Sequence, residues 1–219
     1  MKLVLLADIH GDIVCIEETA EDIKEADVLI IAGDITAKGQ RDEAEQILNA
    51  AEKYNKNILA VHGNMDYDDV RLVLEERNYS LHGNGRMFKG VGFFGVGGAI
   101  ASPIRTRSNY EEHEIAEILE TGYNIIQKAK TKVLVSHIPP KGTCDKTRIL
   151  LHGGSTAVRD FIQSHEDVEL CLCGHVHEAH GVGFLNNSRV VNAGSVKAGR
   201  YARIEIQRRR IMISERKLV

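Results

Sequence analysis

The sequence predicts an α/β fold in which a largely parallel sheet packs against a second sheet, with helices on the flanks. Three patterns in the 219 residues lead to this prediction. Short runs rich in Val, Ile and Leu alternate with segments of helical spacing, as in βαβ units. At residues 85–97, and again beyond residue 178, short and often alternating runs are joined by turn residues, which is typical of antiparallel hairpins.

Five apolar runs each lead into a residue that can bind a metal ion. A strand covered on both faces has a continuous apolar sequence, and ligands of a parallel sheet bind beyond the carboxyl ends of its strands. We therefore expect the terminal Asp, His and Asn side chains to meet at one edge of the sheet. The runs are residues 2–7 before Asp8 and His10, 27–32 before Asp34, 57–62 before Asn64, 132–136 before His137, and 168–173 before His175 and His177.

The segments between these runs have the spacing of amphipathic helices. The start of the third helix, Gly153-Gly154-Ser155, is either a plain N-cap or an anion-binding helix end. The helix faces consist of Ile13, Ile16, Ala20 and Ile23; of Ala44, Ile47, Leu48, Ala51 and Tyr54; and of Val158, Phe161 and Ile162.

The composition indicates a single domain over residues 1–219. The formal net charge of −3 makes nucleic acid an unexpected partner. The arginines at 208–210 lie between two alternating runs, so we interpret them as a hairpin turn. No apolar stretch has the length of a membrane span or of a signal peptide. The four cysteines have neither zinc spacing nor the density of a disulfide framework, so we expect a cytoplasmic protein.

Seven side chains at the ends of the five runs form a mixed set of oxygen and nitrogen ligands. Such a set suits Mn²⁺, Fe²⁺ or Zn²⁺ better than Ca²⁺, and it exceeds what one tetrahedral ion needs. Two divalent ions about 3.5–4 Å apart, bridged by one carboxylate, can hold a hydroxide at neutral pH and bind a phosphoryl group for in-line displacement. The seven are Asp8, His10, Asp34, Asn64, His137, His175 and His177.

The segments that contain these side chains, in their order along the chain, resemble the signature of the calcineurin-like metallophosphoesterases. The resemblance is strongest to small bacterial and archaeal members of phosphodiesterase type. The resemblance implies a four-layer α/β sandwich of two mixed β-sheets flanked by helices. It also implies hydrolysis of phosphoesters by a hydroxide held between two divalent ions. The similar segments are Asp8-Ile9-His10, Gly33-Asp34, Gly63-Asn64 with Asp66, His137, Gly174-His175-Val176-His177, and Asn192-Ala193-Gly194-Ser195.

The resemblance further implies how the ligands are shared. Asp8, His10 and His177 would hold one ion. Asn64, His137 and His175 would hold the other, and Asp34 would bridge both. We expect Mn²⁺ as the activating ion, with Fe²⁺, Zn²⁺ and Ni²⁺ as alternatives.

Met65 departs from the family pattern. Many members have histidine after the asparagine, oriented by the following acid, and this histidine is thought to protonate the leaving oxygen or to neutralise the transition state. A thioether can do neither. His62 and His180 are alternative proton donors, and His62 can equally be packed on the wrong face of its strand.

Several polar groups near the motifs allow two interpretations. Asp12 either orients His10 or caps a helix, and Asp66 is a possible cap of the helix that carries Val70. Arg105 and Arg107 lie in the long segment 97–114, where they either meet a substrate phosphate or are simply exposed.

The function we predict is metal-dependent hydrolysis of a small phosphoester, with phosphodiesters favoured because of Met65. Asp34 and Asn64 are the expected catalytic ligands, and His62 is the candidate acid. A phosphomonoesterase is one alternative. The other is a catalytically weak binding or scaffold protein on the same fold, which loss of the motif histidine favours and retention of every ligand position opposes.

Overall fold

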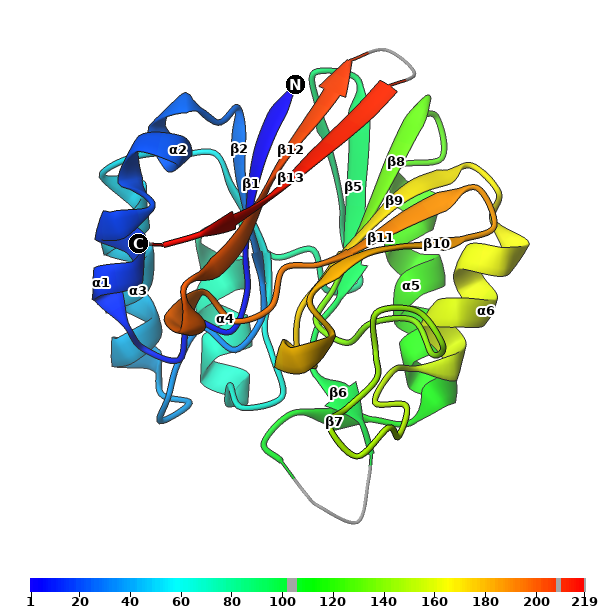
Figure 1. Cartoon of the computed structure of the whole chain (residues 1–219), viewed down its shortest axis with the longest axis horizontal. Helices are drawn as coiled ribbons and strands as arrows, with labels where there is room; N and C mark the ends of the chain where they lie inside the picture. The colour runs from blue at the N-terminus through cyan, green and yellow to red at the C-terminus, as the bar shows by residue number, and fades with distance from the viewer. Residues whose placement is uncertain (102–105, 208–209, 219) are drawn as a thin grey trace.

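The computed structural model describes residues 1–101, 106–207 and 210–218 as four layers, helix, sheet, sheet and helix (Figure 1). Three separate apolar cores account for these layers. One core fills the space between the two sheets, and each of the other two lies between a sheet and its own helices. The predicted division into two sheets flanked by helices is therefore present.

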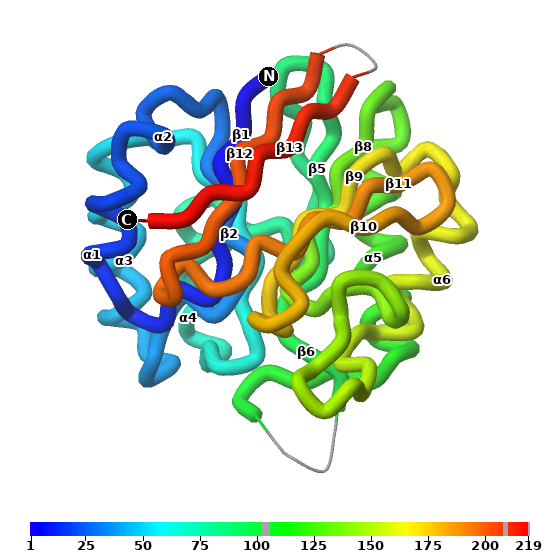
Figure 2. Tube along the Cα trace, in the orientation of Figure 1, coloured from blue at the N-terminus to red at the C-terminus, as the bar shows by residue number. Residues whose placement is uncertain are grey.

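The first sheet has the strand order β13-β12-β1-β2-β3. Its three N-terminal strands are parallel, and β12 and β13 add to β1 as antiparallel strands. Figure 2 shows the C-terminal trace running back beside the N-terminal strand. The strands are β1 (Lys2–Leu6), β2 (Val28–Ala32), β3 (Ile58–Val61), β12 (Arg200–Gln207) and β13 (Arg210–Lys217).

The second sheet has the order β10-β11-β9-β8-β5-β4. Its central strands are parallel, and an antiparallel hairpin forms each side. The strands are β4 (Gly85–Phe88), β5 (Val91–Val96), β8 (Thr131–Ser136), β9 (Val168–Cys173), β10 (Gly181–Leu185) and β11 (Ser188–Asn192). A further pair, β6 (Ala99–Ile100) and β7 (Asn109–Tyr110), lies outside both sheets.

Alternate residues of each strand face different cores, as the period of two requires. In β1, Val4 and Leu6 pack on the outer helices, whereas Leu3 and Leu5 face the second sheet. Helices α1 (Ile13–Glu18), α2 (Ala20–Glu25), α3 (Arg41–Glu52) and α4 (Asp68–Glu76) cover the first sheet, and α5 (Glu112–Ile125) and α6 (Thr156–Ser164) cover the second.

The predicted helix face from Ile13 to Ile23 is divided at Thr19, which lies between α1 and α2. The Thr19 hydroxyl donates a hydrogen bond to Cys15 O at 2.7 Å, and such a bond bends a helix. The other two predicted helices correspond to α3 and α6. Short 3₁₀ helices occupy His177–Ala179 and Val196–Ala198.

The expectation that all five apolar runs belong to one sheet is wrong. The runs that precede Asp8, Asp34 and Asn64 form β1, β2 and β3 of the first sheet, whereas those before His137 and His175 form β8 and β9 of the second. The apolar core between the sheets holds the two sets of strands side by side, so the carboxyl ends of both sets meet. Sequence patterns within a strand carry no information about which sheet it joins.

Two smaller predictions concern the surface. The arginine turn at residues 208–210 has its first two residues outside the described part, and the flanking strands pair as far as Gln207 and Arg210. Among the helices described, none is both long and apolar enough to cross a membrane.

Candidate metal centre

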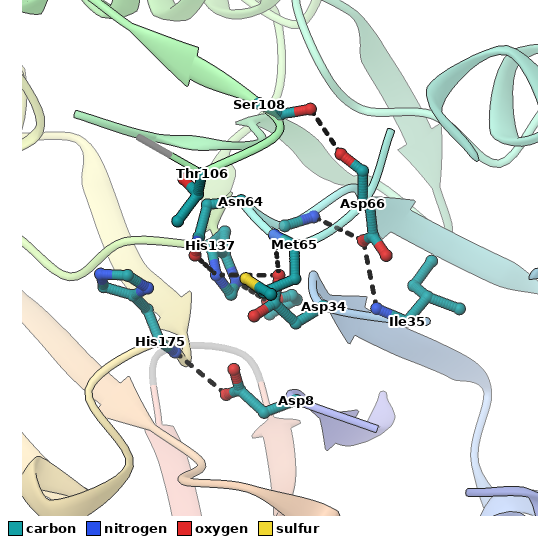
Figure 3. A network of polar contacts seen from close by, with 12 residues as sticks. Asp8, Asp34, Ile35, Asn64, Met65, Asp66, Thr106, Ser108, His137 and His175 are labelled. Carbon is teal, nitrogen blue, oxygen red and sulfur yellow. Dashed lines mark hydrogen bonds and ion pairs between the residues drawn. The ribbon is translucent and has the colours of Figure 1, made fainter. Parts of the chain in front are cut away.

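The predicted ligands gather where the carboxyl ends of five strands meet (Figure 3). Asp8 and Asp34 come from the first sheet, and His137 comes from the second. Asp8, Asp34, Asn64 and His137 are buried, whereas His177 is exposed at the rim.

Four of these residues have a left-handed backbone. The φ angles are 54° at Asp8, 48° at His10, 48° at Asp34 and 67° at His175. Non-glycine residues in this region cost on the order of 1 kcal/mol each, and such residues cluster at functional sites. Hydrogen bonds of the neighbouring backbone, such as Asp8 N–H to Gly33 O at 3.0 Å and His10 N–H to Asp34 O at 2.9 Å, hold this conformation.

Asp8, His10 and His177 form one group with the spacing of metal ligands. His177 Nε2 lies 3.1 Å from Asp8 Oδ1, and His10 Nε2 lies 4.0 Å from the same oxygen. The second carboxylate oxygen, Oδ2, accepts a hydrogen bond from the backbone N–H of His175 at 3.0 Å. This bond fixes the carboxylate so that Oδ1 faces the two imidazoles.

Asp8, Asp34 and His137 form the second group, and Asn64 lies beside it. His137 Nδ1 donates to Ala32 O at 2.8 Å, which leaves the Nε2 lone pair directed into the site. Nε2 lies 2.9 Å from Asn64 Oδ1 and 3.5 Å from Asp34 Oδ1. Oxygen and nitrogen lone pairs face one another here, so a cation or a proton must lie between them.

Two placements differ from the ligand sharing that the resemblance implied. Asp8, rather than Asp34, is the carboxylate common to the two ligand groups, although His10 Nε2 also lies 3.9 Å from Asp34 Oδ2. His175 belongs to neither group, and its ring centroid lies 5.0 Å from that of His137. The assignment of ligands to particular ions therefore stays a prediction.

The donor set itself fits divalent ions. Asp8 Oδ1 is buried and accepts no hydrogen bond of regular geometry from the described residues, although His177 Nε2 lies 3.1 Å away. A buried carboxylate oxygen without a partner is costly, and a metal ion satisfies it. Together with the imidazole nitrogens and the Asn64 amide oxygen, this orphaned oxygen gives the mixed coordination that Mn²⁺, Fe²⁺ and Zn²⁺ accept.

The electrostatics of the site follow from the burial of two carboxylates. Burial raises the pKa of Asp34 to about 6, against the opposing effect of His137. Burial also acts on Asp8, but the His177 ring 3.1 Å away and the other nearby imidazoles outweigh it and lower the pKa of Asp8. Burial and His137 lower the pKa of His175 to about 3, so its ring is neutral and can coordinate.

Two glycines are required because the ligands lie against them. A Cβ on Gly63 would lie 2.0 Å from Asp34 Oδ1, and a Cβ on Gly33 would lie 2.4 Å from His137 Nδ1. Gly33 also has a φ of 86°, which glycine adopts most readily. Gly33 thus allows His137 of the second sheet to approach the first sheet, and Gly63 allows Asp34 to lie against the neighbouring strand end of its own sheet.

The Asn64 loop, residues 63–66, is held by the carboxylate of Asp66. This carboxylate accepts hydrogen bonds from Gly63 N–H at 2.8 Å, from Ile35 N–H at 3.1 Å, and from Thr36 N–H and Oγ1 at 3.0 and 2.6 Å. The interpretation of Asp66 as a helix cap is therefore wrong, because α4 begins after Tyr67 without a side-chain cap. Asp66 instead ties the Asn64 loop to the loop after β2.

Arg107 and Ser108 hold the same loop from the other side. The backbone N–H groups of both residues donate to Asn64 O, at 2.9 and 3.2 Å, and Ser108 Oγ donates to Asp66 O at 2.6 Å. The Arg107 guanidinium donates to Met65 O and Ala37 O, and it lies over the Tyr67 ring. Arg107 thus supports the loop, and Arg105 lies outside the described residues.

Met65 projects from the Asn64 loop toward Asp34 and His137 (Figure 3). Its side chain is half-buried, and its backbone N–H donates to Asp34 Oδ1 at 2.8 Å. The backbone of Met65 therefore positions a predicted ligand, while its thioether places an apolar surface beside the ligand cluster.

His62 and His180, the alternative proton donors, lie in different surroundings. His62 is 1% exposed, and its Nε2 is 3.1 Å from the Tyr110 hydroxyl. Burial, together with His82, lowers the pKa of His62 well below its usual value, so the ring is neutral. Arg200 Nη1 donates to His180 Nε2, so this ring nitrogen already has a partner in the chain. Their catalytic roles stay predictions.

Two helix N-caps decide between the alternative roles predicted for Asp12 and for the segment Gly153-Gly154-Ser155. Asp12 Oδ1 accepts from Val14 N–H at 3.1 Å, which makes Asp12 the N-cap of α1. Ser155 is the N-cap of α6, and the Glu112 carboxylate accepts hydrogen bonds from the first backbone N–H groups of that helix. The N-terminus of α6 is therefore occupied by the Glu112 carboxylate, and the plain N-cap interpretation of this segment holds.

Sequence reasoning missed three groups that support the ligands, namely Ser108, Thr36 and Ala32 O. A backbone acceptor or a hydroxyl far away in the chain leaves no recognisable pattern in the sequence. Ser195 Oγ donates to Asp8 O at 2.8 Å, and its segment Asn192–Ser195 is one of those that carry the family resemblance.

Comparison with known proteins identifies a family. A family model described as calcineurin-like phosphoesterase matches residues 1–179. An uncharacterized protein of Methanocaldococcus jannaschii is 32% identical over 196 residues, which are 88% of this chain and 87% of that protein. The family resemblance of the sequence motifs is confirmed.

Solved structures share the fold at low sequence identity. A protein of Thermus thermophilus superposes with a TM-score of 0.71 at 18% identity, covering 97% of both chains. A dimetal phosphatase from Danio rerio has a TM-score of 0.70 at 14% identity, covering 100% of this chain and 96% of that one. The predicted fold class is thereby confirmed.

The network around Asp66 gives a prediction about the Asn64 loop. Asp66→Asn replaces one accepting oxygen by an NH₂ group that faces backbone donors. We expect the free energy of unfolding to fall by about 2–4 kcal/mol, because buried donors lose their acceptor. Mn²⁺ affinity should fall about tenfold or more, because the loop positions Asn64. Urea unfolding and metal titration measure both effects.

The matched control is Asp69→Asn in the first turn of α4, an exposed carboxylate on the same segment. This change should alter stability by about 0.5 kcal/mol or less. Equal losses in the two variants would show that the Asp66 hydrogen bonds do not hold the loop.

Proposed function

We propose, since the chain belongs to the calcineurin-like phosphoesterase family, that it hydrolyses small phosphodiesters with the help of two divalent metal ions. Family membership establishes the broader class, a metal-dependent phosphoester hydrolase. The preference for diesters depends on Met65, which occupies the position beside Asn64 where many family members have a proton-donating histidine.

The residues that would hold the two ions are Asp8, His10, Asp34, Asn64, His137, His175 and His177. When bound, the ions would supply a nucleophile from water at neutral pH and stabilise charge on the phosphoryl oxygens. Mn²⁺ is the ion we propose first, because the oxygen–nitrogen donor set suits it, and Fe²⁺, Zn²⁺ and Ni²⁺ are the alternatives.

The chain itself contributes orientation and electrostatics. Hydrogen bonds from His175 N–H to Asp8 and from Met65 N–H to Asp34 fix the two carboxylates. The bond from His137 Nδ1 to Ala32 O fixes the tautomer of that imidazole. Because these groups are positioned before substrate binds, little reorganisation is needed during reaction.

Met65 supports the preference for substrates with stable leaving groups. Its half-buried thioether cannot donate a proton, and its apolar surface lies beside Asp34, on the loop that carries Asn64. General-acid assistance typically contributes about 10²–10⁴-fold, and it matters most for basic leaving groups. A site without it should favour aryl or otherwise stabilised leaving oxygens over alkyl phosphomonoesters.

The first prediction of this proposed function concerns the metal ions. Asp34→Asn should abolish activity on bis-(p-nitrophenyl) phosphate and lower metal content, because Asp34 faces both His10 and His137. Asp12→Asn is the matched control, since Asp12 caps α1 through Val14 N–H and should leave metal content unchanged. Elemental analysis and Mn²⁺ rescue of chelated protein measure these effects. Turnover that survives chelation would contradict a metal-dependent mechanism.

The second prediction concerns Met65. Wild-type protein should hydrolyse p-nitrophenyl diesters measurably and alkyl phosphomonoesters poorly. Met65→His should raise kcat/KM for alkyl monoesters by about tenfold or more, because a proton donor is restored, without changing metal content. Asp66 already accepts four hydrogen bonds, so the new ring must be oriented by other groups.

The control for Met65→His is Met65→Leu, which keeps an apolar side chain of similar volume and should retain the wild-type substrate preference. Wild-type protein that is already efficient on alkyl monoesters would contradict this account, because another residue would then supply the proton.

The third prediction tests His62 as that residue. If His62 donates the proton, His62→Gln should reduce turnover of alkyl esters by about 10²-fold or more and spare p-nitrophenyl esters, whose leaving group needs little protonation. Equal losses on both substrates would assign His62 a structural role through Tyr110. The measurement is the turnover rate on alkyl and on p-nitrophenyl esters at matched Mn²⁺ concentration. The same measurement on His180→Gln tests His180 as the proton donor.

A further inference from the structure

A second pocket opens where the edge strands of the two sheets, β3 and β4, approach each other. Its volume is about 270 Å³. Leu59 of β3 and Phe88 of β4 form part of its wall, and both side chains also pack on the core between the sheets. The pocket therefore reaches the edge of the apolar core between the sheets, beside β3 and β4.

The charged residues of the pocket wall are all cationic. Lys56, Arg77 and Arg86 line it, and no Asp or Glu is among the described lining residues. Arg77 is neutralised by Glu52, whose Oε1 accepts its Nη1–H at 2.7 Å. For Lys56 and Arg86, the described part of the chain supplies no carboxylate within 4.0 Å. Two positive charges are thus left for a ligand.

Arg86 gives the more specific observation. Its Nε is buried and has no hydrogen-bond acceptor among the described residues, and its Nη2 reaches only Asn78 Oδ1, at 3.4 Å. A buried donor without an acceptor costs about 1–3 kcal/mol, and more when the group is charged. Because the buried Nε is closed to solvent, a ligand would meet the outer edge of the guanidinium, where Nη1 and Nη2 form a planar fork that matches two oxygens of a phosphate or carboxylate.

We propose that this pocket binds a small organic phosphate with a single aromatic or apolar ester group. A phosphate dianion would be recognised by the Arg86 fork and by Lys56. The ester group would contact Leu59, Phe88 and Met87 on the wall. The volume of about 270 Å³ lies near the lower end of small-ligand sites, so the ligand has about the size of one ring and one phosphate.

This site is separate from the metal centre. β3 runs from Ile58, at the pocket, to Val61, and Asn64 follows three residues later. Six residues of extended chain at about 3.3 Å each place the two ends roughly 20 Å apart. Binding here needs no metal ion, so the proposal does not depend on the proposed function.

The test uses phenyl phosphate and NMR spectroscopy of full-length protein with diamagnetic Zn²⁺, in the Asp34→Asn background so that this aryl ester is not hydrolysed at the metal centre. We expect phenyl phosphate to shift the Arg86 Nε–H resonance and the Leu59 methyl resonances in a saturable manner. Inorganic phosphate, which lacks the ring, should bind about tenfold more weakly, because burial of apolar surface is lost. Equal affinity of the two would contradict the part of the proposal that concerns the ester group.

Variants separate this pocket from the metal centre. Arg86→Gln should weaken phenyl phosphate binding about tenfold or more at the Leu59 methyl resonances, since a charged hydrogen-bonding partner is lost. Lys56→Gln changes an exposed side chain that should not affect folding, and it should weaken binding about threefold or more by loss of one charge. Arg159→Gln, a change on α6 outside the pocket wall, is the matched control and should bind as wild type.

Two results would overturn the proposal. One is an Arg86 Nε–H resonance that stays unmoved by phenyl phosphate at the highest soluble concentration. The other is unchanged binding in Lys56→Gln, together with unchanged binding in Arg86→Gln where that variant folds. Shifts confined to residues near His137 and Asn64 would assign the ligand to the metal centre and would also reject this pocket.

Discussion

Two buried carboxylates, Asp8 and Asp34, set the constraint on which the rest of the site depends. Each lies at the end of a strand of the first sheet, away from water, and each needs positive charge or hydrogen-bond donors. Imidazoles from the second sheet, backbone N–H groups and the predicted metal ions supply these partners. The left-handed backbone at both residues is a local cost that turns the carboxylates toward this shared space.

This constraint explains why two sheets are needed. Asp8, Asp34 and Asn64 follow strands of one sheet, whereas His137, His175 and His177 follow strands of the other. The apolar core between the sheets aligns their carboxyl ends, so packing far from the site determines the distances between its donors. Gly33 then allows His137 to approach the backbone of the first sheet, and Gly63 leaves room for Asp34 beside it.

In the Asn64 loop, some groups hold the backbone in place and others face the metal site. Asp66 and the backbone of Arg107 and Ser108 hold the loop, and the Asn64 side chain faces His137. The N–H and C=O of Met65 join this support, and its thioether lies beside Asp34 and His137. In the function we propose, this thioether determines which leaving groups the site accepts, while the backbone of the loop keeps its conformation.

The sequence alone determined the layered α/β class, the hairpins and the residues that gather at the strand ends, because these depend on local period and on the rule that parallel strands end together. It also indicated the N-cap at Ser155. Tertiary structure alone decided that the five apolar runs belong to two sheets and that Asp66 binds the loop after β2 rather than a helix end. It likewise decided that Arg107 supports a loop. These outcomes depend on partners such as Ala32 O, Ile35 N–H and Met65 O, and backbone groups are identical in every residue, so no pattern of side chains reveals which of them will meet.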